Sequence, residues 1–292
     1  GPVAPVASPA AVAPLTPSVS ASSPSATPSA VATAATPSPR ATNAPALRIG
    51  SVSNFRDVAG AGLPLADGGT MATGVVYRSA KLSTLSAADR RRLAKAGLSL
   101  VIDLRTTAVV RNAPDPSIAG ARYELVNIYG TPRSPRLASR TPAAAKAYMR
   151  SLNVGFVADA GQRSRIADAL RLIARADGPV VIHCTEGKDR TGWVSAVLQL
   201  AAGADRDTVM EEYLRSNTYR ADEIDSAVRS ARRAGGTQEA LTTQALLTVE
   251  ASYLAAGLDE LDRRYGDIDS YLSDGLGLSK ATIAALRARL AG

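Results

Sequence analysis

The amino-acid sequence predicts an α/β fold in which a mainly parallel sheet is flanked by helices and followed by a helical C-terminal third. Two observations support this prediction. Short runs rich in Val and Ile alternate with helical patterns in the middle of the chain, and only helical patterns remain from Asp205 onward. The composition also changes near residue 47, and the stretch 47–292 is long enough for one globular domain.

The first 46 residues form a separate compositional region. They are nearly all Ala, Pro, Ser, Thr and Val, with no aromatic residue and no charged side chain before Arg40. Because frequent Pro removes backbone donors and nothing in the stretch can bury a core, residues 1–46 are expected to be a disordered or polyproline-like tail. Such tails often tether exported bacterial domains. We therefore expect a secreted or cell-surface protein whose signal peptide has been removed.

Four strands are expected in the domain, because four runs are rich in β-branched residues and bounded by Gly, Pro or charge. These runs are "GVVYRS" (74–79), "SLVIDLR" (99–105), "YELVNI" (123–128) and "PVVIHC" (179–184). Between the first two, a helix is predicted from the N-cap Ser86, with Asp89 at the capping-box position and Gly97 as its stop. A second helix is predicted over residues 164–178, where apolar side chains recur every three or four residues.

The C-terminal third carries helical periodicity in four segments separated by Ser, Asp or Gly. They span residues 205–217, 221–236, 239–266 and 279–292. Two interpretations of these helices remain open from the sequence. They form a lid over a site, or they cover one face of the sheet.

The formal net charge of +8 comes mostly from arginine. It suggests attraction to anionic partners, including a transient contact with a membrane surface. The favoured interpretation is that many of these charges lie on solvated helix faces such as "DRRRLAK" (89–95). No basic stretch is interleaved with aromatic residues, so nucleic-acid binding is not expected. The sequence does not indicate an oligomeric state.

The only His and the only Cys of the chain are adjacent in "HCTEGKDRTG", residues 183–192, between an apolar strand and a helix. A loop tightened by Gly187 can turn its backbone N–H groups inward, and the following helix adds free donors and a positive dipole end. Arg190 supplies a planar fork that grips two phosphate oxygens at once. We therefore expect an anion site whose binding residues are His183, Thr185, Glu186, Gly187 and Lys188.

A thiol beneath such a site lies in a field that favours its anion, and cysteine pKa values there fall from about 8.5 to roughly 3.5–7.5. Cys184 is then a nucleophile for phosphorus, and water hydrolyses the resulting cysteinyl-phosphate. Thr191 can donate its hydroxyl to the departing sulfur. Since phosphoryl transfer depends mainly on positioning and charge, no metal or other cofactor is expected. His183 is expected to bond loop backbone, and one His with one Cys cannot build a structural zinc site.

Two aspartates compete for the role of proton donor to the leaving oxygen. Asp189 lies in the loop beside Arg190, and we favour it. Asp103 lies near the end of the predicted strand 99–105, where alternation places it on the same face as Arg105. Asp103 is expected to act in support of Asp189 or in its place. The alternatives are an ion pair that buttresses the loop for Asp103 and a charge partner of Lys188 for Asp189.

Three further charged residues are singled out near the loop. Lys188 adds a second positive charge and is expected to face the substrate, with a solvated loop lysine as the alternative. Arg56 and Asp57 in "NFRD" are expected to brace a turn rather than touch the site. Glu186 adds a negative charge at the mouth, which weakens the binding of highly anionic substrates.

The loop resembles the phosphate-binding loop of the cysteine-dependent protein-tyrosine phosphatase superfamily. The fuller resemblance is to the secreted bacterial tyrosine and phosphoinositide phosphatases of the mycobacterial protein-tyrosine phosphatase B type. Besides the loop, it rests on "NFRDVAG" (54–60), "YRSAKLSTL" (77–85), "VIDLRT" (101–106), "VMEEYLRSNTY" (209–219) and "YGDIDSYLSDGLGLS" (265–279). The resemblance therefore covers nearly all of the chain after residue 47.

The resemblance implies a cysteine-phosphatase fold, export, and an active site that includes Asp103 and Asp189. It implies activity on phosphotyrosine and, in several members, on phosphoinositides and phosphoserine or phosphothreonine. It also favours the interpretation that residues 205–260 form a lid over the active site. Two alternatives remain: a phosphatase of a small phosphorylated metabolite or inositol phosphate, and a non-catalytic phosphate-binding module. The intact set of Cys184, Arg190 and Thr191 argues against the second, because a binding module needs no nucleophile.

Overall fold

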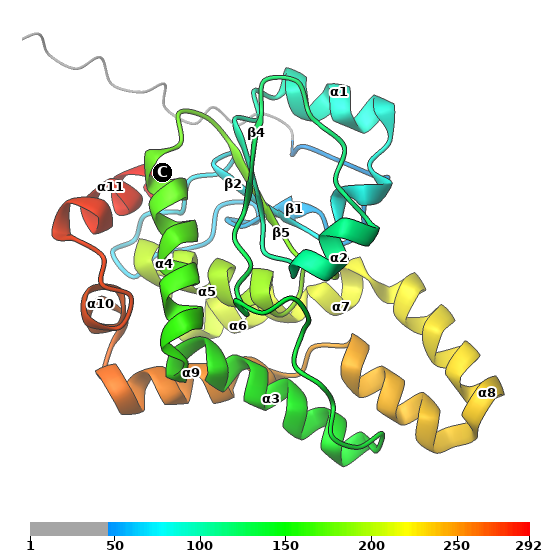
Figure 1. Ribbon diagram of the computed structural model, residues 1–292. Coiled ribbons are helices and arrows are strands. Elements are labelled where there is room, and N and C mark those ends of the chain that lie inside the picture. The colour runs from blue at the N-terminus through cyan, green and yellow to red at the C-terminus, as the bar shows by residue number, and fades with distance from the viewer. Residues whose placement is uncertain (1–45) are drawn as a thin grey trace, which may run out of the picture. The chain divides into compact units, whose positions relative to one another are not determined.

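A five-stranded sheet lies at the centre of the protein in a computed structural model that describes residues 46–292 (Figure 1). The predicted tail, apart from Ala46, lies outside the described residues. The strands are β1 (Arg56–Asp57), β2 (Val76–Ser79), β3 (Leu100–Asp103), β4 (Arg122–Leu125) and β5 (Val180–His183). Their order is β1-β2-β5-β3-β4, with β1 antiparallel to β2 and all other pairs parallel. The predicted mainly parallel α/β sheet is confirmed.

The helices have the following bounds. They are α1 (Ala87–Lys95), α2 (Thr107–Asn112), α3 (Pro142–Ala158), α4 (Ala160–Arg175), α5 (Arg190–Ala202), α6 (Arg206–Leu214), α7 (Ser216–Tyr219), α8 (Ala221–Leu247), α9 (Ala251–Tyr265), α10 (Ile268–Ser270) and α11 (Lys280–Leu290). A 3₁₀ turn spans Leu82–Thr84 and a π-helical turn spans Tyr271–Gly275. Among the described residues, no helix combines the length and apolarity needed to cross a membrane.

The two helices expected between the strands are present as α1 and α4. Ser86 is the N-cap of α1, and its hydroxyl accepts the backbone N–H of Asp89 at 3.1 Å. The reciprocal half of the capping box is absent. The Asp89 carboxylate instead accepts the backbone N–H and hydroxyl of Ser51 at 2.9 and 2.7 Å, which ties α1 to the preceding segment. The second helix begins at Ala160, earlier than expected, because Asp159 caps it.

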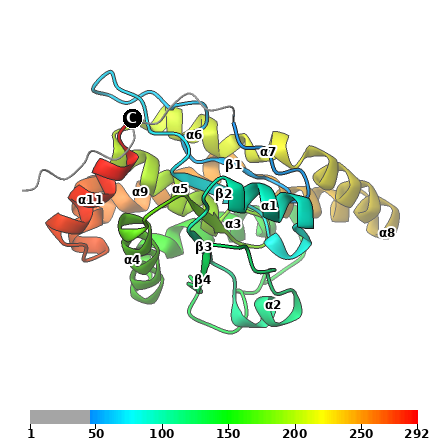
Figure 2. The same cartoon turned by 90° about the horizontal axis from the view of Figure 1, so that it is seen from above.

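Alternate side chains of the strands point into two hydrophobic cores. Val180 and Ile182 of β5 pack in the larger core with Leu170 of α4, whereas Val181 packs in the smaller core with Leu93 of α1. Figure 2 shows α1 and α4 on opposite sides of the strands. A strand covered on both faces needs apolar residues at every position, which explains the continuous apolar run of β5.

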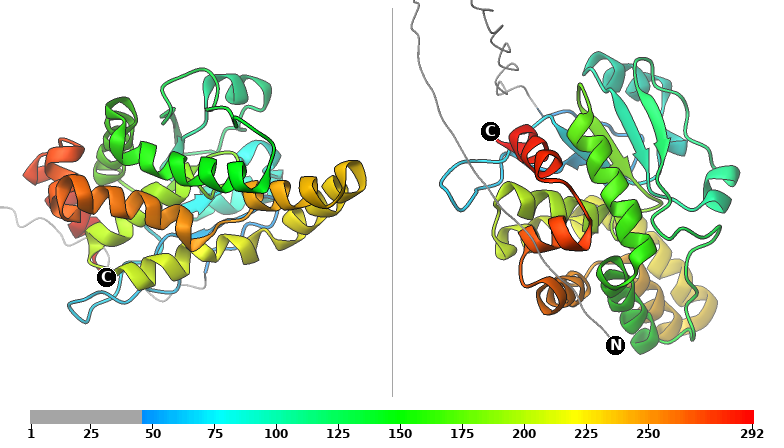
Figure 3. Two further views of the ribbon diagram at one scale, coloured as in Figure 1. Left: turned by 90° about the horizontal axis from the view of Figure 1, so that it is seen from below. Right: turned by 60° about the vertical axis from the view of Figure 1, so that its left-hand side comes forward.

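Two of the helices after the loop, α8 and α9, pack against α3. The span called α8 contains two helical halves, because Gly235 and Gly236 have non-helical backbone angles. The halves run out and back, so that the second half lies beside α3, and α9 packs along α3 as well (Figure 3). The all-helical C-terminal third is confirmed.

The register of the parallel strands brings the chemistry-bearing residues together. His183 at the end of β5 pairs with Ser79 at the end of β2 and with Asp103 at the end of β3. Cys184 therefore leaves the sheet at its carboxyl edge, between two neighbouring strands. This edge is where open α/β sheets usually carry their sites.

Candidate active site

Cys184 is the residue after β5, and its side chain lies at the base of the loop that leads into α5, only 2% exposed. Burial by itself raises the pKa of the thiol. The charge of Arg190 and the polar hydroxyl and backbone N–H of Thr191 outweigh burial and hold the pKa of Cys184 below its ordinary value. The N-terminus of α5 also points its positive end into the loop. The arrangement favours a thiolate.

The loop backbone is held with three consecutive carbonyls turned outward. Thr185 O accepts Lys81 N at 3.0 Å, Glu186 O accepts Asn54 Nδ2 at 3.1 Å, and Gly187 O accepts Arg78 Nη2 at 2.8 Å. Because the C=O and N–H of a trans peptide point in opposite directions, the next three N–H groups face the inside of the loop. Inward N–H groups above an ionised sulfur form the anion-binding nest that the sequence predicts.

Gly187 is required by both its conformation and its surroundings. Its φ is +67°, and a Cβ there would lie 2.4 Å from Ser79 O, which is backbone and cannot move aside. We expect Gly187→Ala to destabilise the fold by about 2–4 kcal/mol, combining left-handed strain with overpacking. Thermal unfolding measures this loss. Gly97→Ala is the matched control, because Gly97 has φ +76° and a methyl group there would meet no atom within 4 Å. Equal Tm values for the two variants would contradict the explanation.

Arg190 extends its guanidinium over the base of the loop. Its Nη1 lies 3.4 Å from Leu104 O and its Nη2 lies 3.5 Å from Thr185 Oγ1, both long contacts. Its Cζ lies 5.0 Å from the centre of the Tyr129 ring, within the range of a cation–π contact. The ring fixes the plane of the fork while the loose polar contacts leave its donors available for two phosphate oxygens.

Asp189 lies at the mouth of the pocket that Cys184 and Arg190 line. Lys188 Nζ donates to both of its carboxylate oxygens, at 3.0 and 3.1 Å. The Lys188 side chain also lines the pocket, but it is only 1% exposed and lies 3.9 Å from Glu186. Glu186 lies 3.5 Å from Arg220 as well, so its negative charge at the mouth is partly neutralised.

Asp103 is placed behind the loop rather than in the pocket. It is fully buried, its carboxylate accepts Arg105 Nε and Nη2 at 2.9 and 2.7 Å, and Tyr123 Oη donates to it at 2.8 Å. Burial by itself raises the pKa of Asp103. The hydrogen bond from Arg105 and the charges of His183 and Arg105 lower it by a larger amount, so the pKa of Asp103 lies below its ordinary value. An ionised carboxylate out of contact with the pocket cannot serve as the proton donor. The geometry fits the alternative of a buttressing ion pair.

His183 also lies behind the loop, fully buried, with Nδ1 3.1 Å from the backbone oxygen of Cys184. This is the backbone contact expected from the sequence. Of the predicted binding residues, Thr185, Glu186 and Lys188 line the pocket, whereas His183 and Gly187 shape the loop from outside it.

Asp103, Asp115 and His183 are the one group of described residues with ligand atoms close enough to hold a metal ion, all within 4.8 Å of one another. Arg105 argues against this use. Its Nη2 donates to Asp103 Oδ2 at 2.7 Å and to Asp115 Oδ1 at 2.9 Å, so a cation already occupies the space between the carboxylates. A metal ion would have to displace a buried, bidentate arginine.

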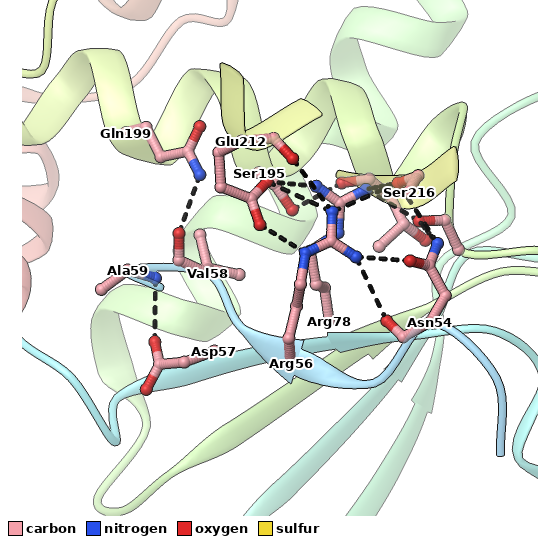
Figure 4. Close-up of polar contacts among 12 residues, drawn as sticks. Asn54, Arg56, Asp57, Val58, Ala59, Arg78, Ser195, Gln199, Glu212 and Ser216 are labelled. Carbon is pink, nitrogen blue, oxygen red and sulfur yellow. Dashed lines mark hydrogen bonds and ion pairs between the residues drawn. The ribbon is translucent and has the colours of Figure 1, made fainter. Parts of the chain in front are cut away.

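A buried polar network holds the outer side of the loop (Figure 4). Glu212 of α6 forms ion pairs with Arg56 of β1 and Arg78 of β2. Asn54 donates to the loop carbonyls and accepts from Arg56, and it adopts a left-handed φ of +59°, a conformation that Asn tolerates better than most residues. Arg56 therefore braces the turn at Asn54, as expected from "NFRD", and supports the loop only through Asn54. Asp57 braces the following turn by accepting the backbone N–H groups of Ala59 and Gly74, and burial raises its pKa to about 6.

Replacing Glu212, whose carboxylate pairs with both arginines, is expected to lower the free energy of unfolding. Glu212→Gln leaves two buried guanidinium groups without a counter-charge, and breaking such a pair costs about 3–5 kcal/mol. Urea unfolding of Glu212→Gln measures this loss against Glu211→Gln, the exposed neighbour on α6. A loss below about 1 kcal/mol for Glu212→Gln would show that the network does not stabilise the fold.

Apart from the loop residues, the pocket above Cys184 is lined mainly by apolar and aromatic side chains. The residues that form this lining are Tyr129 and Ser134 from the segment after β4, Tyr148, Met149 and Leu152 from α3, and Leu246 from α8. Among the described helices after α5, only α8 contributes to this lining, through that single leucine. Three of these six residues therefore come from α3, more than from any other element.

Several of these residues were not found from the sequence. The helix α3 has a clear start signal, since Thr141 is its N-cap and Pro142 its first residue, and buried side chains follow at helical spacing. Tyr129, Arg78 and Glu212 carry no local signal, because their partners are distant in the chain. Asp115 lies in an irregular segment and could not have been singled out.

A low-pKa thiol under an anion nest, an arginine fork and a carboxylate at the mouth define a cysteine-dependent phosphatase. Comparison with known proteins agrees: the family model described as the tyrosine phosphatase family matches residues 47–292, and the chain belongs to this family.

Curated relatives cover most of the chain. The Mycobacterium tuberculosis protein named triple specificity protein phosphatase PtpB is 32% identical over 275 residues, with 82% of this chain and 96% of the relative covered. A Cupriavidus necator relative is 34% identical over 245 residues, with 81% of this chain and 86% of the relative covered. Its name assigns it provisionally as a tyrosine-protein phosphatase. A Nostoc commune tyrosine-protein phosphatase is 30% identical over 220 residues, covering 73% of each chain.

Solved structures give a weaker comparison. The crystal structure of P. aeruginosa TpbA in complex with pTyr has 16% identity and a TM-score of 0.28, covering 73% of this chain and 97% of that one. A score this low supports no conclusion about the site.

Proposed function

We propose that the protein hydrolyses phosphotyrosine through a cysteinyl-phosphate intermediate. The observation that carries this proposal is the pocket itself: a thiolate site at its base and aromatic or apolar walls formed by Tyr129, Tyr148 and Leu152. A phosphorylated phenol matches this pocket, because its anionic phosphate group would lie at the base and its apolar ring would lie between the walls. Apolar walls with a few placed polar groups are typical of sites that bind such ligands.

In the first step, Cys184 Sγ attacks phosphorus and the bond between phosphorus and the phenolic oxygen breaks. Asp189 gives its proton to that oxygen, so that a neutral phenol leaves. Arg190 and the inward N–H groups stabilise the charge on the three equatorial oxygens.

In the second step, water attacks phosphorus and the P–S bond breaks. Asp189, now ionised, accepts the proton of that water, and the Thr191 hydroxyl stabilises the departing thiolate. Inorganic phosphate then leaves with all charges balanced. The same carboxyl thus acts first as acid and then as base.

We also propose phosphoinositides and phosphoserine or phosphothreonine as further substrates. Arg133 and Arg136 are exposed and flank Ser134 in the pocket wall, where they can attract an anionic lipid headgroup or an acidic peptide. The pairing of Glu186 with Lys188 and Arg220 reduces the repulsion that Glu186 would otherwise exert. The name of the mycobacterial relative, a triple specificity phosphatase, supports a broad range.

Phosphate release from a matched panel tests both proposals. The panel holds phosphotyrosine and phosphothreonine peptides, mono- and polyphosphorylated phosphoinositides and inositol phosphates, each with Cys184→Ser as blank. Turnover of phosphotyrosine that disappears in Cys184→Ser is the expected result. Turnover of inositol phosphates alone would replace the proposal with a small-molecule phosphatase. No turnover by a folded protein would favour a phosphate-binding module.

A further inference from the structure

Asp115 lies between α2 and β4, outside the pocket, and nothing in the reaction steps above uses it. Its side chain is 3% exposed. Its Oδ2 lies 2.6 Å from His183 Nε2, and its Oδ1 accepts Arg105 Nη2 at 2.9 Å. A carboxylate buried this completely is costly unless its partners require it. The nearer of its two partners is His183, the residue that precedes the nucleophile.

Both ring nitrogens of His183 face oxygen atoms that can only accept a hydrogen bond. Nδ1 lies 3.1 Å from the carbonyl oxygen of Cys184, and Nε2 faces the carboxylate of Asp115. A neutral imidazole carries hydrogen on one nitrogen only, whereas the imidazolium carries it on both. An acceptor oxygen beside each ring nitrogen therefore favours the protonated form.

The charges around the ring lead to the same result. Asp103 and Asp115 each bring one negative charge, and Arg105 brings one positive charge. Tyr123 faces the cluster as a neutral donor to Asp103. A neutral His183 would leave one negative charge unbalanced among fully buried groups, whereas an imidazolium balances it. Burial alone lowers the pKa of His183, but its close contact with the Asp115 carboxylate and the charge of Asp103 raise that pKa above its ordinary value.

We infer that Asp115 is a positioning residue for the nucleophile: it holds His183 as an imidazolium whose Nδ1–H binds the carbonyl of Cys184 and keeps the thiol ionised. The inference rests on the proposed role of Cys184. The positive ring is attached directly to the nucleophile's backbone, while the carboxylate of Asp115 lies on the far side of the ring. The nearer positive charge therefore dominates at sulfur.

The chain suits a direct test, because it contains one His and one Cys. We expect ¹⁵N NMR of the unmodified protein at pH 7 to show protons on both ring nitrogens of His183. We expect Asp115→Asn to lower the rate of Cys184 alkylation by iodoacetamide at pH 6 about tenfold, by moving its pH midpoint upward about one unit. Asp115→Glu should restore most of the rate, which a loss of packing alone would not allow.

Two results would overturn the inference. One is a neutral His183 ring at pH 7 in the unmodified protein, which needs no variant and so remains decisive if Asp115→Asn fails to fold. The other is an unchanged alkylation profile in a folded Asp115→Asn protein. Neither measurement requires turnover. If the proposed substrate is wrong, the phosphate-release panel will show it, and the NMR and alkylation results will not be affected.

Discussion

Arg190→Lys is expected to lower kcat on phosphotyrosine about 10³-fold, the upper range for loss of a group that stabilises transition-state charge. The guanidinium offers a planar fork, and its ring contact with Tyr129 sets the plane of that fork. Lysine keeps the charge but cannot hold two oxygens of the phosphoryl group at once. Steady-state kinetics over a range of substrate concentrations will separate the fall in kcat from any rise in KM.

The control for this variant is Arg206→Lys, at a partly exposed arginine of α6 whose side chain is 43% exposed. It should leave kcat and Tm unchanged. A fall in kcat of less than about tenfold for a folded Arg190→Lys protein would show that charge alone, without bidentate geometry, carries the role assigned to Arg190.

Asp189→Asn is expected to lower kcat on phosphotyrosine by about 10²–10³-fold, within the range for general acid–base catalysis. The first step needs the protonated carboxyl, so the rate of the unmodified enzyme falls as rising pH removes that proton. Asparagine does not titrate, and this basic limb of the pH–rate profile should disappear. The loss should be smaller on p-nitrophenyl phosphate, because a good leaving group needs little protonation.

The comparison with Asp103→Asn decides between the two aspartates. The structure holds Asp103 ionised behind the loop between Arg105 and Tyr123. Asp103→Asn is therefore expected to lower Tm and to keep the basic limb. If Asp103→Asn removes the basic limb and Asp189→Asn keeps it, the assignment is reversed.

The phosphate loop could be predicted from the sequence because its chemistry is local. Cys184, Gly187 and Arg190 follow one another within a single turn between a strand and a helix. Strand alternation also placed Asp103 on the face opposite Ile102 and Leu104, which pack in the larger core. Alternation could not show that the Asp103 carboxylate is fully hydrogen-bonded by Arg105 and Tyr123, because hydrogen-bond partners are not determined by the face of a strand.

The support and the walls of the site could not be predicted, because they come from distant segments. Arg78 and Glu212 are separated by 134 positions, and no local pattern connects them. Half of the pocket wall outside the loop comes from α3. Its start signal at Thr141 is visible in the sequence, but its position beside the pocket is set by the tertiary fold. Asp115 reaches His183 from an irregular segment, where periodicity offers no guide.

The central claim is that Cys184 attacks phosphorus. Rapid quench of the enzyme with a phosphotyrosine peptide, followed by mass spectrometry of the denatured protein, measures this directly. The account predicts one phosphoryl group, attached to Cys184 and absent from Cys184→Ser. Phosphate release by Cys184→Ser at the rate of the unmodified enzyme, with no phosphorylated cysteine, would contradict it.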